Sequence, residues 1–168
     1  MIWPYVIMAF VTVQRLAEMA IDRRNTARLL AAGAFEVGAA HYPWIVAMHA
    51  AWLATLWATV GHREISLPLL AVYAVLQIFR AWVLMTLGRR WTTRIIVTPN
   101  VPLVSTGPFR FLRHPNYAVV TAEIAVLPLV FGLWWVALVF TLLNAALLSI
   151  RIRTENRALY DEKDGVST

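Results

Sequence analysis

Residues Gly88–Tyr117 read GRRWTTRIIVTPNVPLVSTGPFRFLRHPNY, the longest segment of the chain that is too polar to lie in lipid hydrocarbon. The segment carries five arginines, and apolar segments flank it on both sides. This arrangement predicts a basic loop between membrane-spanning helices, because irregular backbone is not stable against lipid. A loop of this charge is suited to hold an anionic or polar ligand at the membrane surface.

The composition is that of an integral membrane protein. Of the 168 residues, 60% are hydrophobic and 14% are charged, whereas a soluble domain has about 45–50% apolar and about 25% charged residues. The length suggests one domain, residues 1–168. The formal net charge is +6, but the basic residues are arginines at the ends of apolar runs. Membrane topology explains that pattern, so no nucleic-acid partner is predicted.

Two kinds of site are not expected in this chain. There is no cysteine, which excludes disulfides, thiolate catalysis and cysteine-ligated metals. His41, His49 and His62 are too scattered to form a metal-binding set. We therefore predict no metal site, and we read His41 and His49 as polar residues near the interface or in the core.

The fold class expected is an all-α, polytopic membrane protein with about five spans. A helix needs roughly 20 residues to cross hydrocarbon about 30 Å thick. The single Gly132 between the last two spans predicts a tight helical hairpin. The loop 21–40 is expected to hold a short interfacial helix near Leu29, and the tail to be helical to about Glu162 and frayed after Gly165. The predicted spans are about 2–20, 42–60, 66–87, 116–131 and 133–150.

The distribution of basic residues predicts the orientation in the membrane. With five spans, the first loop, the third loop and the tail lie on one side. That side carries all but two of the 15 lysines and arginines, the exceptions being Arg63 and Arg80. The positive-inside rule places this side in the cytoplasm and the N-terminus outside. The polar loop and the tail can therefore build one site there, from about residues 88–117 and 151–160.

Arg80 and Glu123 are charged residues inside predicted spans. Arg80 lies eight residues before Gly88 and Glu123 eight residues after Pro115, which is about 12 Å deep at 1.5 Å per residue. Because a lone charge at that depth costs several kcal/mol, we predict that the two form an ion pair. The pair either locks two helices together or offers one end to a ligand. Gln77 and Asn144 could extend this cluster and are read mainly as polar contacts between helices.

The triplet Arg113-His114-Pro115 precedes the fourth predicted span. Proline favours the first turn of a helix and holds the residue before it in an extended conformation. Free N–H groups at such a helix start attract anions, and Arg113 and His114 add positive charge and hydrogen-bond donors. The triplet fits a carboxylate or phosphate ligand, although it is also typical of a basic cap at the membrane interface.

Three motifs carry a resemblance to a known family. RHPNY (113–117) follows a GPFRF turn (107–111), and RIRTEN (151–156) closes the last predicted span. With these motifs the sequence resembles the isoprenylcysteine carboxyl methyltransferase family, most strongly over residues 88–159. That family belongs to a wider group of small membrane methyltransferases that includes phospholipid N-methyltransferases. Segments similar to bacterial members are QRLAE (14–18), RRN (23–25) and HYPW (41–44).

The resemblance implies S-adenosylmethionine as the methyl donor, bound by the loop and the tail. It implies an active site on the cytoplasmic side of a bacterial inner membrane. Family members often have two adjacent glutamates in the tail, whereas this chain has Glu155-Asn156. Together with Arg113, the candidate cofactor contacts are Leu103, Val104, Gly107, His114, Tyr117 and Glu155.

The candidate catalytic residues are Arg151, Glu155 and Glu123, and the resemblance places Arg151 near the transfer site. Methyl transfer is a displacement at a sulfonium methyl group, and it needs alignment more than an elaborate acid–base set. A carboxylate acceptor is already ionised at neutral pH, whereas a phenol of pKa about 10 needs a base. His114, Glu123 or Glu155 could serve as that base.

The acceptor is expected to be lipophilic, with its tail entering between spans. Its head could be a prenylcysteine carboxylate, the hydroxyl of a phenolic or pyrone lipid, or a phospholipid amine, and similarity to bacterial members favours the hydroxyl. Two other functions are compatible with the sequence. One is a small membrane reductase of the sterol-reductase type with a nicotinamide cofactor, although the chain lacks the extra spans of such enzymes. The other is a non-enzymatic membrane subunit whose polar residues only hold helices together.

Overall fold

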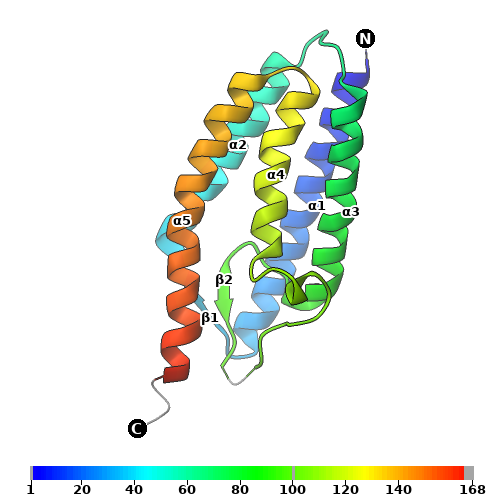
Figure 1. The fold of residues 1–168 in the computed structure, drawn as a ribbon. Helices are drawn as coiled ribbons and strands as arrows, with labels where there is room; N and C mark the ends of the chain where they lie inside the picture. Colours follow the sequence, from blue (N-terminus) through cyan, green and yellow to red (C-terminus); the bar gives the residue numbers. More distant parts are fainter. Residues whose placement is uncertain (1, 100, 165–168) are drawn as a thin grey trace.

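Five long helices form a bundle in which consecutive helices run in alternating directions (Figure 1). The computed structural model describes residues 2–99 and 101–164, with side chains described through residue 158. The connections between helices therefore lie at the two ends of the bundle. In chain order the elements are α1 (Trp3–Ala31), β1 (Phe35–Val37), η1 (Ala39–His41), α2 (Tyr42–Thr59), α3 (Leu67–Leu87), η2 (Gly88–Arg90), β2 (Ile95–Val97), η3 (Gly107–Arg110), α4 (Pro115–Val130) and α5 (Trp134–Asp164).

Among the described residues, three helices are long and apolar enough to cross a membrane: α1, α3 with its continuation into η2, and α5. The helix α4 is apolar but shorter, at 16 residues. Fewer than a third of the residues in the three long apolar stretches are buried inside the bundle. Outward-facing apolar side chains are what a helix presents to lipid. All five predicted helices are therefore present, and three of them have the length and composition of membrane spans.

The first helix is longer than predicted. We expected a span ending near residue 20 and a separate interfacial helix near Leu29, but α1 continues unbroken for 29 residues. No proline or glycine interrupts it where it becomes polar. Its polar residues are buried against the loop instead: Asp22 Oδ1 accepts the N–H of Thr93 at 2.6 Å, and Asn25 Nδ2 donates to the carbonyl of Trp91 at 2.8 Å. Leu29 therefore belongs to the last turns of α1, and the extension fastens the polar loop.

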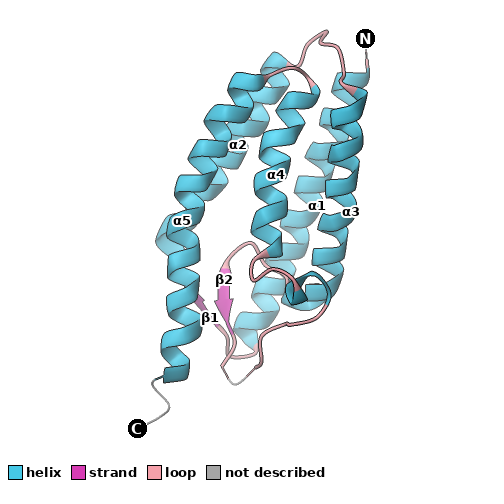
Figure 2. Ribbon diagram, viewed as in Figure 1, coloured by secondary structure: helices cyan, strands magenta, loops and turns pink. Residues whose placement is uncertain are grey.

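A two-stranded sheet departs from the predicted all-α class, in a chain that is otherwise mostly helical. Figure 2 shows this small sheet at the same end of the bundle as the polar loop. Strand β1 pairs antiparallel with β2, so that Glu36 lies opposite Ile96. The Ile-Ile-Val sequence of β2 is β-branched and favours extended backbone. Each strand has only three residues, which is too short for an alternating pattern to reveal it in the sequence.

Helices α4 and α5 form the tight hairpin predicted around Gly132. This glycine has φ +67°, a left-handed conformation that a residue without Cβ adopts at little cost. Its N–H donates to the carbonyl of Leu129 at 3.0 Å. Helix α5 continues for 31 residues from the last predicted span into the tail, which confirms the predicted helical tail. The fraying expected after Gly165 lies outside the described residues.

The apolar core occupies the half of the bundle away from the polar loop. Its fully buried side chains come from α1, α2, α4 and the connection into α5, and include Met8, Leu56, Leu127, Phe131 and Leu133. Because lipid is as apolar as these side chains, their close van der Waals packing is what stabilises this half of the bundle. The other half of the bundle is left to polar side chains, the sheet and two cavities.

Candidate functional site

The polar loop and the tail enclose a cavity of about 340 Å³, here called the first cavity. Its wall combines β2, the segment 101–105, the start of α4 and the middle of α5. The loop and the tail, which the sequence places on one face, therefore line one space. The candidate site residues in its wall are Leu103, Val104, Arg113, His114, Tyr117, Arg151 and Glu155.

Tyr117 is the centre of a polar cluster in this wall. Its hydroxyl donates a hydrogen bond to Glu155 Oε2 and accepts one from Arg151 Nε at 2.7 Å. The guanidinium of Arg151 also lies 5.2 Å from the centroid of the Tyr117 ring, within the range of a cation–π contact. One phenol thus joins α4 to α5 and holds both candidate catalytic residues of the tail.

His114 belongs to the same polar cluster and lines the same cavity. Its ring stacks on Tyr117, with centroids 5.3 Å apart and an interplanar angle of 19°. Its Nε2 lies 3.3 Å from Asn156 Oδ1, and its Nδ1 lies 3.9 Å from Glu155 Oε2. Asn156, which stands where the resembled family often has a second glutamate, therefore serves as a partner of His114.

Helix α4 begins at Pro115, as the triplet before it predicts. The carbonyl of His114 accepts the N–H of Tyr117 at 3.2 Å and that of Ala118 at 3.3 Å, which opens the helix. Pro115 and Asn116 line the first cavity. Pro115 has no N–H, and those of Tyr117 and Ala118 are already hydrogen-bonded, so this helix start offers the N–H of Asn116 and the partial positive charge of the helix, which favours a bound anion.

Gly107 differs from the other candidate contacts because it is not part of the wall of the first cavity. It has φ +57°, and a Cβ at this position would lie 2.6 Å from Thr86 Oγ1. Only a glycine permits so close an approach of η3 to α3. The cofactor contact expected from Gly107 stays a prediction, whereas its packing role follows directly from this geometry.

Two arginines fasten the segments that surround the first cavity. Arg90 Nη2 donates to the carbonyl of Pro102 at 2.8 Å, which secures the segment after β2. Arg94 Nη1 donates to both carboxylate oxygens of Glu36, at 3.0 and 2.8 Å, and these hydrogen bonds raise the pKa of Arg94. Its guanidinium lies 4.4 Å from the centroid of the Tyr42 ring. The sheet and the start of α2 are thereby tied to the loop.

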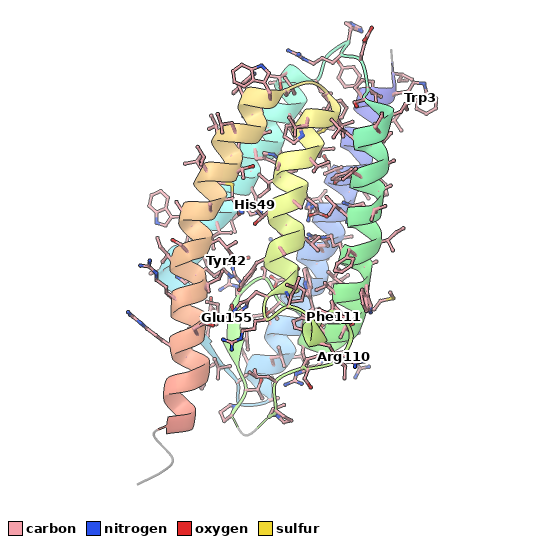
Figure 3. All side chains as sticks on the ribbon, in the orientation of Figure 1. Trp3, Tyr42, His49, Arg110, Phe111 and Glu155 are labelled. Atoms are coloured by element: carbon pink, nitrogen blue, oxygen red, sulfur yellow. The ribbon has the colours of Figure 1, made fainter. Side chains whose placement is uncertain are left out.

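A second cavity, also of about 340 Å³, lies between α1, α2, α4 and α5. Its wall is mostly apolar and includes Ile45 and Leu147. Asn116, Tyr117 and Arg151 line both cavities, so the two spaces are neighbours with one shared polar wall. Figure 3 labels Tyr42 and His49 of the second cavity on α2, and Glu155 of the first cavity on α5, closer to the loop end than His49.

Polar groups also line the second cavity. The Nδ1 of His49 lies 2.8 Å from the carbonyl of Ile45, and donation to that carbonyl leaves Nε2 as an acceptor. Trp52 and Trp91 are each 2% exposed, and their indole nitrogens have no hydrogen-bond partner among the described residues. A buried donor without a partner is costly.

The predicted ion pair between Arg80 and Glu123 is present, with Arg80 Nη1 2.7 Å from Glu123 Oε2. It belongs to a larger charged group, because Arg80 also pairs with Glu18. Arg15 joins both glutamates: its Nη1 lies 3.0 Å from Glu18 Oε2, and its Nη2 lies 2.7 Å from Glu123 Oε2. Gln77 Nε2 donates to Glu123 Oε1 at 2.8 Å. Two arginines and two glutamates thus compensate each other inside the bundle, as buried charges require.

Glu123 is 1% exposed and lines neither of the two cavities. Its partner Arg80, however, lines the second cavity, as do Arg15 and Glu18, so this charged group joins helices and also faces that cavity. Asn144 does not join the charged group, because its Nδ2 donates to Thr121 Oγ1 at 3.0 Å and so links α5 to α4. Gln77 and Asn144 therefore both connect helices, but Gln77 does so within the charged group and Asn144 outside it.

Three residues of this half of the molecule were not among the sequence candidates. Asn116 lies in both cavity walls, and its position inside the RHPNY motif is a signal for it. Arg15 and Glu18 belong to the buried charged group. Their spacing of three residues puts both on one side of α1, where a charged pair within a span is a signal in itself.

These features define a class: a helical membrane protein whose polar loop and last helix enclose one cavity beside a second, apolar one. Residues 69–161, more than half of the chain, match the model of the Isoprenylcysteine carboxyl methyltransferase (ICMT) family, and the chain belongs to this family. The family predicted from the RHPNY and RIRTEN motifs is thereby confirmed. The matched region runs from α3 to α5 and includes the residues of the first cavity that follow α3.

Two proteins are similar to nearly the whole chain. A Bacillus subtilis (strain 168) protein named "Uncharacterized protein YpbQ" is 42% identical over 162 residues, covering 94% of this chain and 96% of its own length. An "Uncharacterized protein" of Haemophilus influenzae is 23% identical over 167 residues, covering 95% and 96%. The similarity therefore includes α1 and α2, which precede the family match. No solved structure matches the chain significantly.

Proposed function

We propose that the protein transfers a methyl group from S-adenosylmethionine to a lipophilic acceptor, namely the carboxylate or hydroxyl of a prenylated or phenolic lipid. The observation that carries this proposal is the wall shared by the two cavities, Asn116, Tyr117 and Arg151, in a member of the methyltransferase family. A polar cofactor in the first cavity and a lipid head in the second would meet at this wall.

The residues of the first cavity fit S-adenosylmethionine in size and chemistry. A volume of about 340 Å³ lies within the range of about 300–1,000 Å³ of small-molecule sites. Arg113, His114 and the start of α4 suit the carboxylate of the cofactor. Glu155 and Asn156 suit its ammonium group and ribose hydroxyls, and the apolar residues of β2 suit the adenine.

When bound, S-adenosylmethionine supplies an electrophilic methyl group, and the protein contributes alignment and exclusion of water. Tyr117 holds Arg151 and Glu155 through two hydrogen bonds, so the shared wall keeps a fixed geometry. Arg151 lines both cavities and can orient an acceptor oxygen by charge-assisted hydrogen bonding. Glu155 lines only the first cavity, so we assign it to the cofactor.

The second cavity suits the tail of a lipid acceptor. Leu16 of α1 and Val46 of α2 line it, yet they are 56% and 42% exposed. This cavity is therefore accessible from the outer surface between α1 and α2. An apolar tail could pass there from the bilayer without contact with water, which is the favourable path for it.

We further propose that the chain acts as a single domain, residues 1–168, with its site facing the cytoplasm. The polar loop, the sheet and the end of α5 lie at the same end of the bundle (Figure 1). Most of the arginines belong to these segments and to the end of α1. The positive-inside rule places such an end on the cytoplasmic side, in a bacterium the inner face of the inner membrane.

The cofactor assignment is tested by calorimetric binding to the purified protein in detergent. We expect S-adenosylmethionine and S-adenosylhomocysteine to bind and NADPH not to bind. His114→Ala and Glu155→Ala should lose this binding while remaining folded. The matched control is His62→Ala, which changes an exposed histidine in the turn between α2 and α3. Binding of NADPH alone would favour a reductase, and no binding to folded protein would refute the cofactor assignment.

The acceptor site is tested separately with a variant that fills the second cavity. Leu148→Trp places a larger side chain in its wall. We expect this variant to bind S-adenosylhomocysteine normally but to lose labelled methyl transfer to membrane lipid extracts. The control Leu142→Trp changes a residue of the same helix that is 63% exposed. Equal transfer by both variants would contradict acceptor binding in this cavity.

A further inference from the structure

The loop around η3 folds back along the outside of α3. A Cβ on Gly107 would lie 2.6 Å from Thr86 Oγ1 and 3.3 Å from Trp82 Nε1. Both residues belong to the last two turns of α3. The loop therefore lies beside the helix at the depth of its last turns, not beyond its end. For a helix that crosses a membrane, this is the level of the headgroup–hydrocarbon boundary.

Large apolar side chains are exposed at this level. Phe111, the residue after η3, is 75% exposed, and Leu112 is 48% exposed. Met85, in the last turns of α3, is 73% exposed. We call Phe111 and Leu112 the loop tip. Adjacent large apolar side chains this exposed mark an interaction surface, and Phe and Leu are residues with which interfacial segments enter the headgroup–acyl boundary.

Cationic side chains flank the loop tip. Arg110 and Arg113 stand on either side of it in the chain, and Arg89 follows α3; all three are exposed. Figure 3 shows Arg110 and Phe111 beside each other near the loop end of α3, on the side away from α5. Apolar residues between arginines match the chemistry of a phospholipid boundary, where acyl chains meet phosphates.

We propose that the loop tip inserts into the headgroup–acyl boundary of the phospholipid leaflet, with Arg89 and Arg110, which line neither cavity, directed to lipid phosphates. This membrane contact is independent of the proposed methyl transfer. The other face of the same loop, including Leu103, lines the first cavity. Lipid on the outer side therefore supports the wall on the inner side.

The absence of cysteine from the chain allows a direct test with single labelled cysteines. Phe111→Cys carries an environment-sensitive NBD label in vesicles of phosphatidylcholine and phosphatidylglycerol. The water-facing control is Pro99→Cys, an exposed position after β2, and the deep control is Ile78→Cys, 70% exposed in the middle of α3. Quenching is measured with lipids that carry a nitroxide at a shallow or a deep position of the acyl chain.

We expect the label at position 111 to emit at shorter wavelength than the label at 99. The shallow nitroxide should quench it more strongly than the deep one, whereas the label at 78 should show the reverse order. Emission and quenching equal to those at 99 would overturn the proposal. A blue-shifted label that neither lipid quenches would also overturn it, because a second protein copy would then cover the loop tip. Retained helical content and a single elution peak in detergent establish that each variant is folded.

Discussion

The Nε of Arg151 donates a hydrogen bond of 2.7 Å to the hydroxyl of Tyr117, and these two residues belong to the walls of both cavities. The contact crosses from the last helix to the first turn of α4. Because the same hydroxyl donates to Glu155, one oxygen atom fixes the position of two ionised side chains. The shared wall therefore depends on a single phenol.

Tyr117→Phe removes this oxygen and keeps the ring. We expect the variant to remain folded and to bind S-adenosylhomocysteine at least about 10-fold more weakly, since hydrogen bonds to charged groups contribute about 1.5–3 kcal/mol. Calorimetry in detergent measures the change. The matched control is Tyr5→Phe, at the start of α1 and at the end of the bundle away from the polar loop. It should bind as the unmodified protein does. Equal affinities of the two variants would show that the phenol does not organise the site.

Glu123→Ala removes one carboxylate from the buried charged group and leaves Arg80 and Arg15 without it. We expect a loss of about 3–5 kcal/mol in the free energy of unfolding, because an uncompensated buried charge remains. The measurement is denaturant unfolding in detergent. Glu64→Ala, in an exposed turn, should change it by less than about 0.5 kcal/mol.

The double variant Arg80→Met/Glu123→Met provides a sharper test of the same charged group. It removes both partners and leaves Arg15 paired with Glu18. We expect it to be more stable than Glu123→Ala, since no buried charge is left unpaired. A double variant that is less stable than Glu123→Ala would mean that packing, not charge compensation, dominates at this position.

Gly107→Ala tests the close approach of η3 to α3. The added Cβ would lie 2.6 Å from Thr86 Oγ1 at a residue with φ +57°, so we expect a loss of about 1–3 kcal/mol in stability. Gly33→Ala is the matched control, because it also has positive φ but no atom within 4 Å of the added Cβ. Thermal unfolding compares the two, and adding Thr86→Ala should recover part of the loss. Identical melting temperatures would contradict steric contact at Gly107.

Acidification should destabilise the fold through His41, the last residue of η1. Burial lowers the pKa of His41, and the nearby charge of Arg151 lowers it further. A folded-state pKa below the unfolded value means that the folded protein favours the neutral imidazole. The stabilisation of the folded state by neutral His41 is present above about pH 6.5 and is lost as pH falls below it, because the unfolded chain then binds the proton more readily. The melting temperature should fall less between pH 7.5 and 5.5 in His41→Gln than in His62→Gln. An equal fall would exclude His41 as the source.

The helices and the family were predictable because their signals are local in the sequence. Runs of about 20 apolar residues require helices in a membrane, and Gly132 predicts the hairpin without further information. The ion pair of Arg80 and Glu123 was also predictable, since two charges at one depth must compensate each other. The length of α1 and the presence of the sheet were not predictable from the sequence, because the polar residues of these elements are hydrogen-bonded by partners distant in sequence. Asp22 accepts from Thr93, and Glu36 accepts from Arg94.

The sequence by itself therefore determined the helical membrane class, the tight hairpin, the family and the segments that line the first cavity. Only the tertiary structure decided which polar groups meet. It brought Arg15 to Glu123 across 108 positions of the chain, placed Gly107 against α3 rather than in a cavity wall, and put Asn116, Tyr117 and Arg151 between two cavities. The physical reason is that hydrophobicity and backbone preference act on neighbouring residues. Compensation of buried charge and cavity shape arise only when separate helices pack.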